Sequence, residues 1–374
     1  MLHSKFRCKS VISRRTLLKS AALLCGSPFI NRGRFRIFAQ DSTEYSSQTL
    51  ELVRNSTVID MLGLLTLDWA KLSGWRTQPG RFRPSDFQKL KDSGITIFHP
   101  AVGYADGDIY GASLGDISGW NAFINAHPAD FLRVDCPGDV GLAKKLGKIG
   151  IVIGQQNSSH FRTVDDVDKF YGMGQRVSQL TYTGNRIGGG SSDQRDQGLS
   201  EFGARIVERM NRLGMAVDIS HCSDRTTLDA VDASRKPALI THSNCRALVP
   251  NSARCKTDEA IVKMAAKGGV MGVTMIRSFV RAQGAVTVEN VLDHIDHVVK
   301  LAGIEHAGIG TDVDLDGRDR RIRPRKRSDL DGIDYERKIF DLTEGLLRRN
   351  YSRRNIELIL GGNFERALSG IWNS

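Results

Sequence analysis

Two histidines, His221 and His242, stand where two short apolar segments end, at residues 215–219 and 238–240. Residues 224–234, between them, have the spacing of a helix. The order of strand, histidine, helix, strand and histidine is that of a βαβ unit, in which the carboxyl ends of the parallel strands meet at one edge. Imidazole nitrogens that meet at such an edge are typical zinc ligands, so this stretch favours metal binding.

Each histidine also has a simpler interpretation. A single histidine at a strand end more often packs against neighbours or caps an element than binds a metal ion. Two histidines on neighbouring strands favour the metal more strongly, because such strands lie about 4.8 Å apart and their end residues converge. The pair alone leaves both interpretations open.

The rest of the chain has to position these histidines, and its pattern predicts a barrel. Eight candidate strands, each followed by a helix or a loop, lie at residues 57–65, 95–101, 149–156, 176–182, 215–221, 238–242, 269–275 and 307–312. The clearest further helical patterns lie at residues 201–213, 258–267, 288–302 and 333–349. Eight alternations predict an α/β fold of the (β/α)8 TIM-barrel type. A doubly wound sheet would need a glycine-rich phosphate turn after an early strand, and the early strands lack one.

The charge of the chain is concentrated at its start. The 374 residues carry a net charge of +11, but residues 1–39 hold nine lysines and arginines and no acidic residue. The remainder therefore carries a charge of only about +2, which removes the main support for nucleic-acid binding. We expect residues 40–374 to form a single barrel domain with N- and C-terminal extensions.

Residues 1–39 have the features of a twin-arginine signal peptide. Arg14 and Arg15 precede a modest apolar run at residues 21–25, and a cleavage site is expected after Ala39. The apolar run is much shorter than the ~20 residues that a membrane-spanning helix needs, so no stable span should remain after cleavage. The sequence thus predicts export by the twin-arginine route to a periplasmic or other extracytoplasmic location.

Four motifs, in order along the chain, carry a resemblance to a known family. They are NRLGMAVDISH at 211–221, KPALITHS at 236–243, GIGTD at 308–312 and ILGGNF at 359–364. These motifs resemble those of the membrane (renal) dipeptidase family, peptidase family M19, and the similarity extends from about residue 58 to residue 372. The resemblance implies a metal-dependent barrel of the amidohydrolase type that hydrolyses dipeptides with two zinc ions joined by a glutamate. It also suggests a divergent bacterial member of that family.

The resemblance assigns roles to four residues. His221 and His242 match the two histidine ligands of one zinc ion. Asp312, at the end of the last strand, matches an aspartate that is a ligand of the other zinc ion. Arg254 matches an arginine that holds the carboxylate of the substrate.

Four other positions depart from the family pattern. The histidine and aspartate expected after the first strand are replaced by Leu62 and Leu64. The bridging glutamate corresponds to Gln156, and a histidine that contacts substrate corresponds to Thr183. Leucine cannot bind a metal ion, and a neutral amide oxygen does not bridge two cations as a carboxylate does. The binuclear site should therefore be degraded.

The ligands that the chain retains predict about one zinc ion per subunit. Its ligands would be His221, His242 and Asp312, with the amide oxygen of Gln156 as a further donor and an open position for water. Zinc would acidify that water and polarise the amide carbonyl, while Asp312 would transfer protons. Asp312 cannot easily be both ligand and base, so the general base is undefined if it binds the ion.

Two functions follow. The first is a zinc-dependent, dipeptidase-like hydrolase of dipeptides or related small amides; the second is a non-catalytic barrel that binds a peptide or an anionic ligand. The retained histidines favour the enzyme, and the lost ligands of the first strand favour the binder. The expected partner is a small peptide or another carboxylate-bearing substrate, and a homodimer is possible. The basic run at residues 318–327 is either a solvated loop or a segment that attracts anions.

Other candidate ligands have ordinary interpretations. His294 and His297 are three residues apart in a helical pattern, where a packed or solvated face is expected. His160, just past Gln156, could line the site, but a surface position is expected first, and His99 is expected to be structural. For Cys222 and Cys245, near the two key histidines, a disulfide, an extra ligand and an inert thiol are all open, with the inert thiol as the default.

Overall fold

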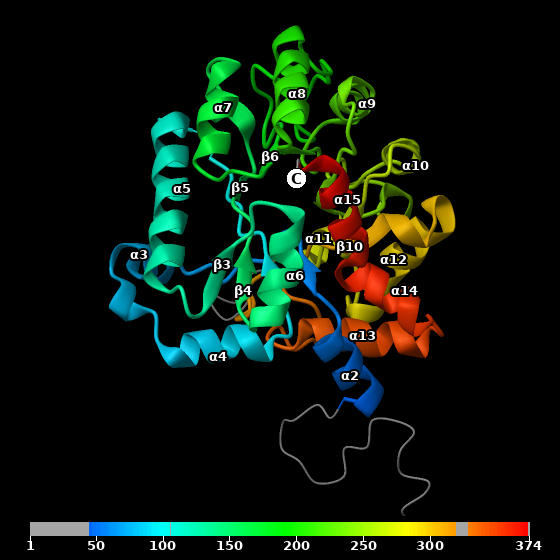
Figure 1. Ribbon diagram of the computed structural model, residues 1–374. Coiled ribbons are helices and arrows are strands. Elements are labelled where there is room, and N and C mark those ends of the chain that lie inside the picture. The colour runs from blue at the N-terminus through cyan, green and yellow to red at the C-terminus, as the bar shows by residue number, and fades with distance from the viewer. Residues whose placement is uncertain (1–44, 105, 319–327, 373–374) are drawn as a thin grey trace, which may run out of the picture.

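The computed structural model describes residues 45–104, 106–318 and 328–372 (Figure 1). The strands are β1 (Ile59–Asp60), β2 (Ile97–Phe98), β3 (Phe131–Arg133), β4 (Ile149–Ile151), β5 (Gly154–Gln155), β6 (Val177–Gln179), β7 (Ala216–Asp218), β8 (Ile240–Ser243), β9 (Met271–Val273) and β10 (Ala307–Ile309). The helices are α2 (Ser47–Asn55), α3 (Trp69–Thr77), α4 (Pro84–Asp92), α5 (Ile109–Ala126), α6 (Pro137–Leu146), α7 (Asp165–Gly172), α8 (Glu201–Leu213), α9 (Asp224–Ala233), α10 (Asp258–Ala266), α11 (Arg277–Val280), α12 (Val288–Ala302), α13 (Lys338–Arg348), α14 (Arg353–Glu357) and α15 (Asn363–Ile371). The expected leader, residues 1–39, and residues 319–327 of the basic run lie outside the described residues.

The strands close into a parallel barrel. One sheet has the order β3-β4-β2-β1-β10-β9-β8 and a second has the order β5-β6-β7. Only two residues separate β4 from β5, so together they form one barrel strand. Single parallel bridges, from Val102 to Gln155 and from Asp218 to Leu239, join the two sheets at both ends. The result confirms the predicted TIM-barrel fold, with each of the eight candidate strands in its expected place.

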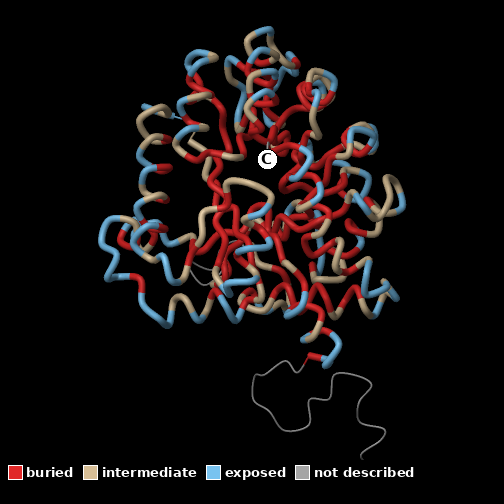
Figure 2. The backbone as a smooth tube through the Cα atoms, viewed as in Figure 1, coloured by how far each residue is buried: buried red, intermediate tan, exposed pale blue. Residues whose placement is uncertain are grey.

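Apolar strands and a helical layer make the core. The helices surround the strands (Figure 1), and the strand residues are buried while the outer helix faces are exposed (Figure 2). The barrel is tight inside: a Cβ atom on Gly310 would lie 1.8 Å from the carbonyl oxygen of Thr241, so only glycine fits there. None of the helices in the described ranges is long and apolar enough to cross a membrane.

Buried carboxylates fix the carboxyl ends of the strands. The carboxylate of Asp60, on β1, accepts hydrogen bonds from the backbone nitrogen and the hydroxyl of Thr311, at 2.8 and 2.5 Å. The ammonium group of Lys338 lies 3.8 Å from the same carboxylate, and both side chains are fully buried. Burial lowers the pKa of Lys338, and the charge of Asp60 opposes that shift. These contacts hold β1 against β10, where Asp312 emerges.

The ILGGNF motif closes the opposite rim. A π-helical turn at Leu358–Gly362 leads into α15. A Cβ atom on Gly361 would lie 2.0 Å from the carbonyl oxygen of Thr57, so the turn packs directly on the segment that leads into β1. The side-chain amide of Asn363 donates to the carbonyls of Ile304 and Ala307, which fixes the start of β10. This motif therefore supports the barrel from the side away from the histidines.

Candidate active site

The two histidines meet at the carboxyl rim of the barrel. His221 follows β7 and His242 lies on β8, and their Nε2 atoms are 3.0 Å apart. His242 is fully buried, and the ring of Tyr182 stacks on His221 with a centroid distance of 4.3 Å. The predicted convergence of two strand ends thus produces a pair of facing imidazole nitrogens.

A hydrogen-bond chain fixes the ring of His242. The hydroxyl of Thr241 donates to the carboxylate of Asp218 at 2.7 Å, and the hydroxyl oxygen of Thr241 lies 2.9 Å from Nδ1 of His242. Because the single proton of the hydroxyl goes to Asp218, Nδ1 of His242 has to be the donor to Thr241. Nε2 of His242 is then unprotonated and presents its lone pair to His221. A carboxylate that orients an imidazole through a hydroxyl is the kind of support that metal-binding histidines receive.

Both histidines are held in the neutral form. Burial, and then the positive charges of Arg254 and Lys256, lower the pKa of His221 well below its ordinary range. Burial and Arg254 also lower the pKa of His242. Neutral imidazole is the form that binds a metal ion, so this environment keeps the pair available as ligands.

The guanidinium of Arg254 is hydrogen-bonded to the backbone around the histidines. Its guanidinium donates to the carbonyls of Ser220 and His242, at 2.7 and 2.8 Å, and to the hydroxyl of Ser243 at 3.1 Å. Only its Nε, which is buried, has no hydrogen-bond partner. The structure therefore shows Arg254 as a residue that positions both histidines, and a direct contact with a substrate carboxylate remains a prediction.

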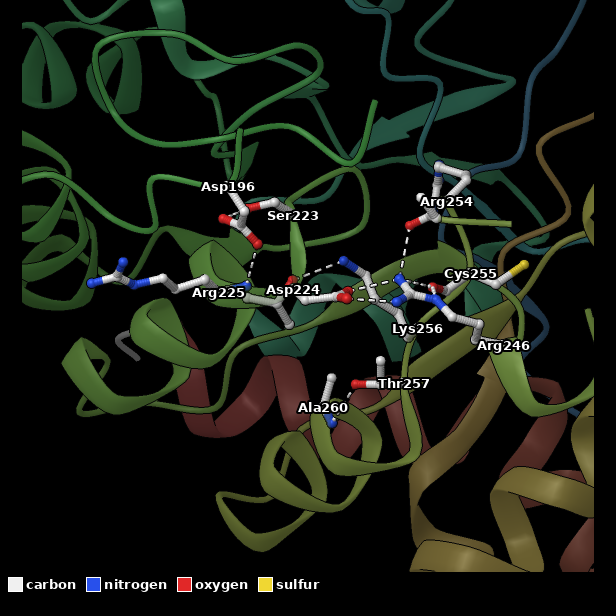
Figure 3. A network of polar contacts seen from close by, with 12 residues as sticks. Asp196, Ser223, Asp224, Arg225, Arg246, Arg254, Cys255, Lys256, Thr257 and Ala260 are labelled. Carbon is white, nitrogen blue, oxygen red and sulfur yellow. Dashed lines mark hydrogen bonds and ion pairs between the residues drawn. The ribbon is translucent and has the colours of Figure 1, made fainter. Parts of the chain in front are cut away.

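The segment that carries Arg254 is itself anchored (Figure 3). The guanidinium of Arg246 binds both carboxylate oxygens of Asp224, at 2.5 and 2.7 Å, at the start of α9. The buried ammonium of Lys256 donates to the carbonyl of Cys222 at 2.8 Å, next to His221. Burial lowers the pKa of Lys256 to about 8. The loop after β8 is thus tied to the loop after β7 on both sides of Arg254.

Asp312 lies at the same rim, on the other side of the site. Its backbone has a φ of 57°, a left-handed conformation that is uncommon for a residue other than glycine. The backbone nitrogen of Asp312 donates to the carbonyl of Leu62 at 2.9 Å, and a guanidinium nitrogen of Arg318 lies 3.7 Å from its carboxylate. Burial raises the pKa of Asp312 to about 6, against the opposing effect of Arg318.

A cavity of about 490 Å³ connects these groups. Its polar lining includes Gln156, Tyr182, His221, Asp312 and Arg318. The amide nitrogen of Gln156 donates to the carbonyl of Ala101 at 2.9 Å. The structure therefore brings His221, Asp312 and Gln156 to one cavity, as the sequence predicted, with His242 directly behind His221.

Thr183 does not line this cavity. It is exposed and lies with Gly184 and Arg186 on the wall of a neighbouring hollow of about 880 Å³. Tyr182, one residue earlier, faces the histidines. Tyr182, rather than Thr183, therefore lines the cavity beside the histidines, and the substrate contact expected of Thr183 stays a prediction.

The donors present fit one zinc ion in part and do not fit two. His221 and His242 supply two neutral nitrogens of the kind zinc prefers. Over the described ranges, no three His, Cys, Asp or Glu side chains are grouped so that they could hold a metal ion, so the structure does not bring Asp312 to the pair as a third ligand. Leu64 lines the cavity after β1, where no donor atom is offered. A third ligand would have to come from the amide oxygen of Gln156, from solvent or from substrate.

The two histidines of α12 have structural roles. His294 is buried between the carbonyl of Val280 and the backbone nitrogen of Cys245, and His297 pairs with Asp258 at 2.8 Å. These contacts confirm a packed face of α12.

The surface role expected for His160 is wrong, because its ring is fully buried and bonded to the carbonyl of Asn157 and the side chain of Gln175. His99 is also buried, 2.6 Å from the carbonyl of Met61. The four cysteines of the described ranges are free thiols, which confirms the inert default for Cys222 and Cys245 over a disulfide.

Comparison with known proteins gives one consistent result. Residues 51–373 match the membrane dipeptidase family, peptidase family M19. An uncharacterized dipeptidase of Schizosaccharomyces pombe is 34% identical over 197 residues, which cover 50% of this chain and 46% of that protein. Dipeptidase tcpJ of Claviceps purpurea is 30% identical over 248 residues, which cover 65% and 54%. The chain spans about half the length of the curated relatives it matches.

A solved structure agrees over a longer span. The crystal structure of an amidohydrolase from Pseudomonas aeruginosa superimposes with a TM-score of 0.76 at 28% sequence identity. The match covers 87% of this chain and 99% of the other. The barrel fold is therefore shared along almost all of that protein.

Proposed function

The chain belongs to the membrane dipeptidase family, peptidase family M19, and from this premise we propose that it hydrolyses the amide bond of dipeptides or related small amides. The family consists of zinc-dependent peptidases. In this chain we propose one zinc ion per subunit, held by His221 and His242, in a site that has lost the ligands of a second ion at Leu62 and Leu64.

The facing histidine pair carries this proposal. Two neutral imidazoles with Nε2 atoms 3.0 Å apart, one fixed by a buried carboxylate through Thr241, exceed what packing requires. The pair borders a cavity of about 490 Å³ that also contains Asp312, an ionisable group whose pKa lies near the working range of a proton-transfer residue. Such a grouping at the carboxyl rim of a barrel is where TIM-barrel enzymes place their chemistry.

The zinc ion and the protein side chains would supply different parts of the mechanism. A zinc ion at this pair would lower the pKa of a bound water to about 7 and polarise the scissile carbonyl. Asp312 takes the proton of the attacking water and returns it to the leaving amine, because a carboxyl group with a pKa of about 6 exchanges protons readily near neutral pH. Arg254 keeps both imidazoles in place through the carbonyls of Ser220 and His242.

A second candidate function is a barrel that binds a peptide or an anionic ligand without hydrolysing it. It is favoured by the absence of any three-donor group within the described ranges and by the leucines after β1. The two proposals differ in a simple way, since only the enzyme turns over a dipeptide.

The test is to replace His221 and His242 one at a time with Ala and to assay a panel of dipeptides with added Zn²⁺ or Mn²⁺. Each substitution should abolish metal binding and hydrolysis and leave the circular dichroism spectrum unchanged, because the rim carries chemistry and the packed interior carries stability. His297→Ala, on α12, is the matched control and should keep full activity. A wild-type protein that hydrolyses no dipeptide supports the binder, and active His221→Ala and His242→Ala variants place the site elsewhere.

We also propose that the protein is exported by the twin-arginine route to an extracytoplasmic compartment. The support is the sequence of residues 1–39, with Arg14 and Arg15 before a short apolar run. A carboxylate-bearing substrate fits Arg318, which lines the cavity and begins the basic run.

A further inference from the structure

The cavity has two chemically different walls. Its polar wall is formed at the ends of β5, β6 and β7, by Gln156, Tyr182 and His221. Its apolar wall is formed mainly by the loops after β1 and β2 and by α11, from Leu64, Leu67, Trp69, Val102, Ile276 and Phe279. In the closed barrel of eight strands β7 lies four strands from β1, so His221 and Leu64 stand on opposite sides of the rim, and the bridge from Val102 to Gln155 joins the two walls where β2 meets β5.

The apolar wall is fixed in place at its base. Leu64 is only 6% exposed, and the adjacent Gly63 bridges to Val313 on the far side of Asp312. Phe279 is half-buried, with its ring 5.4 Å from the guanidinium carbon of Arg254. This wall is therefore built against the same residues that position the histidines and the carboxyl group.

The mouth of the apolar wall is open. Trp69 is the first residue of α3 and is 56% exposed, which leaves much of its indole ring in water. An indole that borders a cavity and remains half-solvated is suited to cover a ligand, because aromatic faces provide contact area at little cost in conformational entropy. The adjacent Asp68 caps α3 by accepting from the backbone nitrogen of Lys71, which fixes the direction in which Trp69 projects.

We propose that the cavity selects amides with a large apolar side chain, which packs against Leu64, Trp69 and Phe279 while the amide faces Gln156 and His221. The inference rests on the proposed function for the position of the amide, and it adds the class of substrate. A dipeptide with leucine or phenylalanine side chains matches both walls. Diglycine leaves the apolar wall in contact with water, and a charged side chain packed against Leu64, Trp69 and Phe279 would lose part of its hydration.

Calorimetric titration of the full-length mature protein tests the proposal without turnover. The probes are the analogues of Leu-Leu and Gly-Gly in which CH₂–NH replaces the scissile amide. The wild type should bind the leucyl analogue at least about tenfold more tightly, the discrimination expected when an apolar pocket gains several methylene groups. Trp69→Ala and Leu64→Asn should each reduce this preference below about threefold, and Leu248→Asn, at an exposed leucine outside the cavity, should retain it.

The possible outcomes of this experiment test the apolar specificity separately from the proposed hydrolysis. A wild-type preference below about threefold, including no binding of either analogue, overturns the proposal, as does a preference that survives both cavity substitutions. Trp69→Ala keeps the test decisive if Leu64→Asn does not fold, because most of the indole is already exposed. Hydrolysis of Leu-Leu and Gly-Gly at equal rates would leave the proposed enzyme standing and remove the apolar specificity. Tight binding of the leucyl analogue by a protein that hydrolyses nothing would support the apolar specificity and contradict the proposed enzyme.

Discussion

Replacing Asp312 by Asn should make the protein more stable above pH 6. Burial raises the pKa of this carboxyl group from 3.8 to about 6, so between about pH 4 and pH 6 the folded protein holds a proton that the unfolded chain has released, and above pH 6 ionisation of the buried group costs stability. Asparagine has almost the same shape and tolerates the left-handed φ of 57° at least as well. The substitution therefore removes the ionisable group and keeps the local geometry.

The sign and size of the effect follow from linkage. Well below pH 4 the carboxyl group carries its proton in both the folded and the unfolded state, so the wild type and the Asp312→Asn variant should differ little in charge-related stability. As the pH rises through 4 to 6, the unfolded chain ionises first and the wild type loses stability relative to the variant. A pKa change of this size corresponds to about 3 kcal/mol, an upper value because the side chain is still 16% exposed and Arg318 lies nearby.

Urea unfolding of both proteins at several values between pH 4 and pH 8 measures this effect. The difference in unfolding free energy should grow by up to about 3 kcal/mol in favour of Asp312→Asn and then level off above pH 7. Asp130→Asn, at a residue before β3 that does not line the cavity, is the matched control. A difference that does not change with pH would refute the claim that Asp312 holds its proton in the folded state. The same variant should lose hydrolytic activity, since asparagine cannot transfer a proton.

Two further predictions concern the metal site and the leader. The combined substitution Leu62→His, Leu64→Asp and Gln156→Glu restores the donors expected after the first strand and between the two ions. Elemental analysis should then find two bound metal ions per subunit in place of one. An unchanged metal content would show that the apolar wall is not a vacated metal site. Replacing Arg14 and Arg15 together with Lys should leave unprocessed precursor in the cytoplasm, detected by fractionation and N-terminal sequencing, whereas normal processing would argue for another route.

The barrel was predictable because its strands and helices are marked locally. The segment at residues 201–213 was predicted to the residue as a helix, because the sequence places Ser200 at its N-cap and Gly214, with a φ of 86°, directly after it. Strand β3 was missed because Phe131–Arg133 is only three residues long and lacks β-branched side chains.

The site was predictable only in part. The histidine pair could be predicted because each histidine comes soon after an apolar run and the two runs lie side by side in the barrel. Tyr182 lines the cavity and Thr183 does not, which the sequence could not show because both residues lie in the loop beyond β6, where strand alternation no longer sets the direction of a side chain. The apolar wall could not be predicted, because Leu64 and Trp69, after β1, and Phe279, on α11, are far apart in the sequence and come together only when the barrel closes.

The most direct test of the account is the metal content of the purified mature protein, prepared without chelator and measured by elemental analysis. The facing nitrogens of His221 and His242, with leucine at positions 62 and 64, predict about one zinc ion per subunit, lost in His242→Ala and retained in His297→Ala. Two tightly bound ions would contradict the degraded site inferred at the first strand. A protein that takes up no ion even with added Zn²⁺ would contradict the proposed hydrolase itself.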